Sequence, residues 1–140
     1  MMPIDPKINE NLNSVVDNIK KAAETAQRNS QDVTLVAVSK THPAETVVEA
    51  LAAGHRVFGE NKVQEAEDKW PALKKAYPDA KVHLIGPLQS NKTKRAVQLF
   101  DVIETVDRAK LARALAREMD QQARHPDCYI QINTGEEPQK

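Results

Sequence analysis

A lysine that closely follows an apolar segment is the residue best suited to covalent chemistry in this sequence. Lys40 comes after the run Val33–Val38 and Ser39, so we expect its ammonium to lean over the mouth of a sheet with little water around it. A lysine with the usual pKa of about 10.4 is neutral in only about one molecule in 10³ to 10⁴ at pH 7. Desolvation or a nearby cation lowers that pKa and produces the free amine that forms a Schiff base with an aldehyde. The alternative is a strand-end lysine that simply reaches solvent.

Polar residues accompany the next apolar segments in the same way. Asn61 ends the second segment, and Gln89 and Asn91 come shortly after the third. Asn61 and Asn91 each lie near the start of a helix, where capping and ligand binding are both open roles. His83 lies inside the third segment and is either a packed, hydrogen-bonded core imidazole or a group that faces a ligand. Gly86 ends that segment and either makes a turn or lets the backbone approach a ligand closely.

The sequence lacks the residue patterns that several other chemistries require. The histidines at positions 42, 55 and 125 share no spacing typical of metal ligands, so we expect no metal site. Cys128 is the single cysteine and has no basic residue nearer than Arg124, which indicates a buried and inert thiol. The glycine-rich loops GxGxxG and GxxxxGK[ST] are missing, which argues against a dinucleotide or nucleoside triphosphate site.

The composition is that of one globular domain. Of the 140 residues, 40% are hydrophobic and 29% charged, and 20 basic residues balance 20 acidic ones. Zero net charge gives no overall attraction to nucleic acid or to an anionic membrane. The basic run 92–95 has no aromatic neighbours and is typical of a solvated helix face, so we expect neither a nucleic-acid nor a membrane partner. The absence of a signal-like N-terminus and the single cysteine favour the cytoplasm.

Helical and strand patterns alternate along the chain. Apolar residues recur with helical spacing over residues 8–28, which predicts an amphipathic helix. Residues 33–38 are apolar and β-branched with little alternation, which predicts a strand covered on both faces. Four further strands are predicted at residues 56–61, 81–86, 102–106 and 128–133.

Start and stop signals place helices between these strands. Pro43 near the first helical position and Gly54 beyond the last bound one helix. Asp107 is the expected N-cap of the final helix. The two helices between them cover residues 62–76 and 90–100. In the former, Pro71 is expected to kink or restart the helix.

A helix followed by five strands in alternation with four helices indicates parallel, right-handed βαβ units of the α/β class. Two architectures are open at this point: a doubly wound open sheet and a (β/α)8 barrel, which usually needs about 250 residues. After the fifth strand the chain runs into a polar loop, residues 134–140, so the sequence looks interrupted. In both architectures ligands bind beyond the carboxyl ends of the strands, where the polar residues gather.

Four sequence blocks together resemble the pyridoxal phosphate homeostasis protein family. The blocks are Ala37–Thr41, Phe58–Asn61 followed by Gln64–Glu65, His83–Lys92, and Ile130–Asn133. They occur in the order and spacing of that family, and the similarity covers essentially all 140 residues. Each block alone is a weak signal, but their conjunction is very specific.

The resemblance implies a partial (β/α)8 TIM barrel of the alanine racemase N-terminal type, preceded by a helix. It also implies that Lys40 holds pyridoxal 5'-phosphate (PLP) as a Schiff base. Asn61, Gln89 and Asn91 would line the mouth that receives the cofactor, and His83 would point toward it. The family is regarded as a carrier or buffer of PLP in vitamin B6 homeostasis, without an established catalytic reaction.

A PLP-dependent amino-acid racemase is the alternative function. Such an enzyme needs a second acid or base opposite the cofactor face. The sequence offers only Tyr77 and Tyr129 as tyrosines for that role, and Tyr77 lies at a predicted helix end.

The resemblance further implies that residues 1–140 are a single, incomplete PLP-binding barrel domain in which strands six to eight are absent. In such barrels the loops after strands seven and eight and a helix N-terminus usually grip the phosphate, so we expect PLP binding to be weak and reversible. A five-stranded portion exposes two unpaired strand edges and part of the apolar barrel interior. These surfaces predict that the fragment either self-associates or is the ordered portion of a longer or nicked protein.

Overall fold

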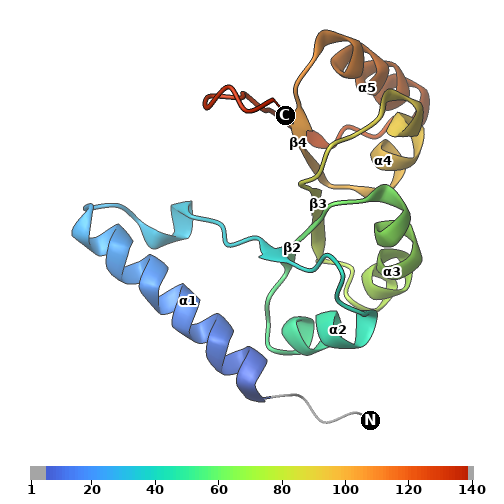
Figure 1. The fold of residues 1–140 in the computed structure, drawn as a ribbon. Helices are drawn as coiled ribbons and strands as arrows, with labels where there is room; N and C mark the ends of the chain where they lie inside the picture. Colours follow the sequence, from blue (N-terminus) through green and yellow to red (C-terminus); the bar gives the residue numbers. More distant parts are fainter. Residues whose placement is uncertain (1–5, 139–140) are drawn as a thin grey trace.

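Helices and strands alternate in the computed structural model, which describes residues 6–138 (Figure 1). In chain order they are α1 (Pro6–Thr25), β1 (Ala37–Val38), α2 (Ala44–Ala52), β2 (Val57–Glu60), α3 (Val63–Ala76), β3 (Lys81–Leu84), α4 (Thr93–Leu99), β4 (Val102–Val106), α5 (Ala109–Gln122) and β5 (Asp127–Ile130). Short 3₁₀ helices, η1 (Ser30–Asp32) and η2 (Ser90–Lys92), precede β1 and α4. The predicted alternation is therefore confirmed.

The strand order decides between the two architectures. All pairings in the sheet are parallel, and the strands lie in the order β1-β2-β3-β4-β5. A doubly wound sheet reverses its order at a switch point, whereas a barrel keeps the order of the chain. Helices α2 to α5 lie along the same side of the sheet, as they do on the outside of a barrel (Figure 1). The sheet is therefore wound as a barrel is.

The hydrophobic core fills the layer between the sheet and these helices. Phe58, Leu84 and Ile103 point from their strands into this layer, and Trp70 of α3 packs against them, each at most 1% exposed. Side chains alternate between the two faces of a sheet, so the other strand residues face the opposite side. They include Gly59 and the residues that pair with it in register. That second face corresponds to the inside of a barrel.

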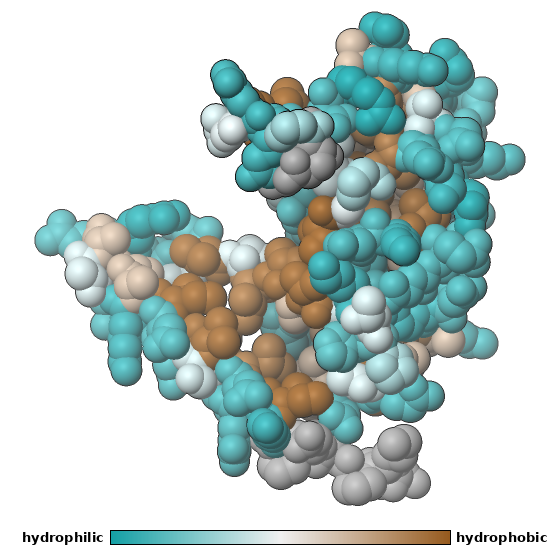
Figure 2. Space-filling model, viewed as in Figure 1, coloured by the Kyte–Doolittle hydropathy of each residue, from teal (hydrophilic) through white to brown (hydrophobic). Residues whose placement is uncertain are grey.

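Helix α1 is only partly packed on this core. Ile8 and Leu12 in its first half contact the core, while its second half projects beyond the β1 edge of the sheet (Figure 1). Apolar side chains gather between α1 and the sheet and remain visible on the surface (Figure 2). Val15 and Val33 are 43% and 39% exposed, so this region carries uncovered apolar surface.

Strand β1 is shorter and less covered than predicted. It comprises two residues instead of the predicted 33–38, and Val38 is 50% exposed rather than buried on both faces. The reason is that β1 pairs only with β2 among the described residues. Cys128 is likewise exposed, contrary to the prediction of a buried thiol, because β5 lies at the other edge of the sheet.

The structure also corrects two predictions about helices. Pro71 lies inside α3 and does not restart it, because Trp70 and Leu73 on the same helix are anchored in the core on either side of the proline. Asp107 does not cap α5; the N-cap position is Arg108, whose guanidinium pairs with the Asp107 carboxylate at 2.8 Å.

Two features are absent from the described residues 6–138. No helix combines the length and the apolar character that crossing a bilayer requires. No group of three or more His, Cys, Asp or Glu side chains is placed to hold a metal ion.

Candidate functional site

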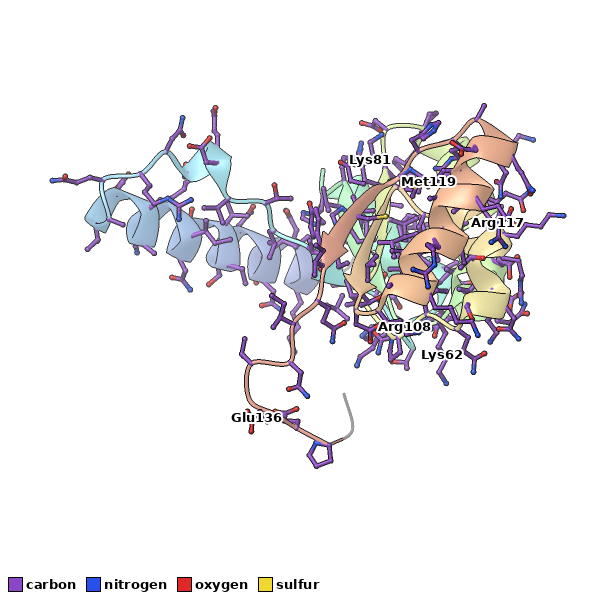
Figure 3. All side chains as sticks on the ribbon, turned by 90° about the horizontal axis from the view of Figure 1, so that it is seen from above. Lys62, Lys81, Arg108, Arg117, Met119 and Glu136 are labelled. Atoms are coloured by element: carbon purple, nitrogen blue, oxygen red, sulfur yellow. The ribbon has the colours of Figure 1, made fainter. Side chains whose placement is uncertain are left out.

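The carboxyl ends of the parallel strands form one end of the sheet. Figure 3 shows this end through Lys62 and Arg108, which follow β2 and β4, while Lys81 at the start of β3 lies at the opposite end. Ligands of parallel α/β proteins bind beyond the carboxyl ends of the strands. The residues that follow each strand are therefore the candidates for a site.

Lys40 lies in a tight turn immediately after β1. The backbone N–H of His42 donates to the carbonyl of Ser39 at 3.2 Å and closes the turn. The amine of Lys40 makes no hydrogen bond or ion pair within residues 6–138, so it is free to react. The expectation that little water surrounds it is wrong for this structure, since Lys40 is exposed. Water reaches it because β1 is an edge strand with one neighbour in the described chain.

Lys69 is buried next to this turn and hydrogen-bonds to its backbone. Its side chain is only 6% exposed, and its ammonium donates to the carbonyls of Ser39 and His42, both at 2.8 Å. The same ammonium forms an ion pair with Glu60 at 2.7 Å and with Glu65 at 3.3 Å. A buried cation needs such partners, because an unpaired charge in the interior is very costly. Lys69 therefore joins β2, α3 and the turn after β1.

Glu60 is the buried acceptor at the centre of this network. One of its oxygens, Oε1, accepts from the Ser39 hydroxyl at 2.8 Å and from the Trp70 indole N–H at 3.0 Å, in addition to the Lys69 ammonium. Its other oxygen, Oε2, is buried and has no partner within the described residues. Glu60 thus points into the helix layer and holds the fold together, while its neighbour Asn61 stands at the strand end.

Glu65 connects the network to the backbone of the turn. Its carboxylate accepts from the backbone N–H of Thr41, which follows Lys40. Partial burial favours the neutral acid, but the Thr41 N–H and the Lys69 ammonium outweigh it and lower the pKa of Glu65. Because this pKa lies below that of an exposed glutamate, about 4.3, the ionised carboxylate stabilises the fold at neutral pH. That contribution is lost as the pH falls through the lowered pKa.

Asn61 is placed by a close approach between two backbones. A Cβ atom on Gly86 would lie 2.2 Å from the Asn61 carbonyl oxygen and 2.8 Å from its Cα. The carbonyl of Gly86 accepts from the buried Thr105 hydroxyl at 2.8 Å, which fixes Gly86 from the other side. Only glycine leaves room for Asn61 here, so Gly86 makes a close approach within the protein itself.

His83 faces the barrel-interior side of the sheet. It pairs in register with Gly59 and Val102, and it is 7% exposed. Its Nδ1 lies 2.7 Å from Oε1 of Glu104. A carboxylate only accepts, so Nδ1 of His83 is the donor of this hydrogen bond. His83 is therefore a hydrogen-bonded imidazole on the barrel-interior side of the sheet.

Gln89 and Asn91 lie in the loop and the 3₁₀ helix η2 that follow β3. Both are exposed, and neither side chain has a hydrogen-bond partner among residues 6–138. The Asn91 side chain is thus not a helix cap, and both amides are available to a ligand. In the basic run just beyond, Arg95 donates to Glu67 and Gln64, so part of its charge is neutralised within the protein.

Four residues of this arrangement are missing from the sequence prediction as site residues: Glu60, Glu65, Lys69 and Glu104. A signal for Lys69 exists in the sequence, because Lys69 lies next to Trp70 on the apolar stripe of its helix, four residues after Glu65. A charged residue on an apolar helix face requires a buried partner. No comparable signal identifies Glu104, which pairs with a residue of a different strand.

The comparison with protein families decides where the chain belongs. The family model described as alanine racemase, N-terminal domain, matches residues 11–137. The chain belongs to this family. Its five parallel strands and their helices are the N-terminal part of the TIM barrel of the alanine racemase N-terminal domain family, as the resemblance implies.

Several relatives are similar to this family member over most of its length. The pyridoxal phosphate homeostasis protein of Vibrio alginolyticus is 37% identical over 135 residues, and that of Escherichia coli K12 is 40% identical over 134. Each alignment covers 95% of this chain but only 58% and 57% of the relative. The chain therefore spans somewhat more than half the length of these proteins.

Solved structures give the same result. PipY of Synechococcus elongatus without PLP is 43% identical, with a TM-score of 0.75, over 87% of this chain and 56% of PipY. PipY with PLP bound is also 43% identical, with a TM-score of 0.72, over 83% of this chain and 54% of PipY.

Proposed function

We propose that this chain binds PLP through Lys40 and takes part in intracellular PLP homeostasis. The observation that carries the proposal is the PLP-bound structure of PipY, whose fold matches most of this chain at 43% identity. The relatives named for PLP homeostasis favour this function over the racemase alternative. A cytoplasmic location accompanies the proposal, since the single free cysteine requires no oxidising compartment.

The residues at the carboxyl end of the sheet fit the chemical groups of PLP. The unpaired Lys40 side chain would suit the aldehyde, with which its amine would condense to a Schiff base with release of one water. The side-chain amides of Asn61, Gln89 and Asn91 provide hydrogen-bond donors and acceptors for the ring substituents. His83 presents Nε2 on the barrel-interior face, held in place by Glu104. These assignments follow the positions of the residues at the strand ends.

We further propose that the described chain acts as one barrel-forming unit with a weak hold on PLP. The phosphate of a ligand in such barrels is usually held by loops after strands seven and eight. Among residues 6–138, the groups proposed to contact PLP are the Lys40 amine, the three amides and His83. A Schiff base on a lysine amine forms reversibly, so we expect PLP to leave on dialysis.

Chemical trapping tests this function directly. The chain is incubated with PLP, reduced with borohydride and analysed by peptide mass spectrometry. We expect the pyridoxyl label to concentrate on Lys40 and to disappear from that peptide in Lys40→Ala. Lys94→Ala removes an exposed lysine at the start of α4 and serves as the matched control. Label spread evenly over surface lysines, and unchanged in Lys40→Ala, would show that Lys40 is not the PLP site.

Exposed strand edges support a second proposal, self-association of the described chain. Strands β1 and β5 end the sheet, and Ile130 and Ile132 near the β5 edge are 80% and 73% exposed. Unpaired edges with apolar side chains promote pairing between chains.

Light scattering during size-exclusion chromatography tests this second proposal. We expect a mass above the 15.6 kDa of one chain. The double variant Ile130→Lys and Ile132→Lys should shift the sample toward one chain, because charges on an edge strand oppose pairing. Val48→Lys adds a charge at an exposed apolar position on α2 and should leave the mass unchanged. A monodisperse single chain in the unmodified protein would refute the proposal.

A further inference from the structure

Lys69 and Glu65 of α3 hold both sides of the turn that carries Lys40. Lys69 donates to the carbonyls of Ser39 and His42, which flank the turn, at 2.8 Å each. Glu65 accepts from the backbone N–H of Thr41, the residue directly after Lys40. Neither residue hydrogen-bonds to the Lys40 amine; their hydrogen bonds are to the backbone of the turn that carries it.

The turn needs external support because of its backbone conformation. Thr41 has a φ of 64°, in the left-handed region that β-branched residues rarely adopt. Such a conformation persists only where surrounding contacts hold it. The Glu65 carboxylate supplies one of these contacts at Thr41 itself, and Lys69 supplies two more at the neighbouring carbonyls.

The support is itself rigidly anchored. The Lys69 and Glu60 side chains are 6% and 0% exposed, and their ion pair at 2.7 Å connects α3 to β2. Separating the partners of a buried ion pair is strongly unfavourable, so Lys69 and Glu60 stay paired in the folded chain. Glu65 is different, because its side chain is 29% exposed and lies at the edge of the network. Glu65 can therefore be replaced without leaving a charge unpaired in the core.

We infer that Glu65 and Lys69 are positioning residues for Lys40: they fix the backbone of residues 39–42, so that the reactive amine stands above the carboxyl ends of the strands before an aldehyde arrives. The inference rests on the proposed function, since it concerns how Lys40 meets PLP. A turn that is already ordered loses less conformational freedom when the ligand binds, which increases affinity. Neither side chain needs to touch PLP for this effect.

Three variants of α3 test the positioning role by two readouts. Glu65→Ala removes the acceptor for the Thr41 N–H, whereas Glu65→Gln keeps an acceptor oxygen of the same reach. Glu67→Ala is the matched control, because it removes the same charge from the same helix, and its partner is Arg95 rather than the turn. The first readout is amide hydrogen exchange of Thr41 in the chain without PLP. The second is the apparent Kd for PLP at Lys40, measured by trapping with borohydride.

In Glu65→Ala we expect Thr41 exchange to rise about tenfold and PLP affinity to fall about tenfold, the size of one charge-assisted hydrogen bond. Glu65→Gln and Glu67→Ala should stay within about threefold of the unmodified chain in both readouts. Lys69 is a poorer target, because its loss would leave the Glu60 carboxylate unpaired in the core.

Two results would overturn the positioning role. One is a PLP affinity in Glu65→Ala equal to that of the parent chain, with the parent chain trapped at Lys40. This result would leave the proposed function intact. The other is an equal loss of affinity in Glu67→Ala, which would assign the effect to charge rather than to the turn. A parent chain that takes up no PLP at Lys40 is a distinct outcome, and it would overturn the proposed function together with the positioning role.

Discussion

Replacing Gly86 with alanine should destabilise the chain by about 3 kcal/mol or more, the upper range for forcing extra atoms into a packed site. The new methyl group would lie 2.2 Å from the Asn61 carbonyl oxygen and 2.8 Å from its Cα. Both are backbone atoms and cannot move aside by a change of rotamer. The two backbones must therefore separate at the carboxyl ends of β2 and β3.

The separation should also have local signs that urea denaturation alone would miss. The N–H of Ile85 donates to the carbonyl of Glu60 at 2.9 Å, one residue before each of the clashing positions. We expect faster hydrogen exchange at Ile85 and weaker PLP trapping at Lys40, because the strand end that carries Asn61 moves.

Gly135→Ala provides the control for Gly86→Ala. A Cβ at Gly135 would meet only Glu137 side-chain atoms, at ordinary contact distances of 3.8 and 3.9 Å. Its stability should change by less than about 0.5 kcal/mol, as for most surface substitutions. Equal urea midpoints for Gly86→Ala and the parent chain would contradict the close approach between Gly86 and Asn61.

Trp70→Ala should be the most destabilising single truncation in the core, with a loss of about 3 to 5 kcal/mol. Trp70 is fully buried and is the largest of the fully buried side chains among the described residues. Its ring packs 5.1 Å from that of Phe58, centroid to centroid. Its indole N–H also donates to Glu60. The truncation thus removes packing and a hydrogen bond to a buried carboxylate together.

Trp70→Phe separates these two contributions. Phenylalanine keeps most of the apolar volume but has no donor for Glu60, so the loss should be about 1.5 to 3 kcal/mol, the contribution of a hydrogen bond to a charged group. Urea denaturation measures both variants, provided that the slope with denaturant is unchanged. A Trp70→Phe variant as unstable as Trp70→Ala would assign the whole effect to the hydrogen bond and contradict the packing role.

The sequence was sufficient to predict the element order because each strand and helix has its own local pattern. The strand 102–106 and the α/β alternation are examples, and both are confirmed. Predictions that depend on neighbours were less successful. The buried strand 33–38 and the buried Cys128 both assume cover from elsewhere in the fold, yet they lie at the sheet edges. A local sequence pattern does not show whether a strand lies in the centre or at an edge of the sheet.

The site shows the same division. The positions of Lys40, Asn61, Gln89 and Asn91 near strand ends follow from the strand pattern alone. Their roles toward PLP stay predictions. The Lys69–Glu60 ion pair and the His83–Glu104 hydrogen bond join residues from different elements, and no spacing rule connects them. Glu60 illustrates the limit, since it adjoins Asn61 in one motif but points into the helix layer.

The sequential strand order has a consequence for how this protein is made. Among residues 6–138, β2 to β5 each pair with the strand that precedes them in the chain, so each of them can add to a strand that is already synthesised. Each βαβ unit of about 30 residues can dock on its predecessor as it leaves the ribosome. Translation can therefore extend an existing sheet from one side only, and the edge formed by β1 stays open while the other edge advances.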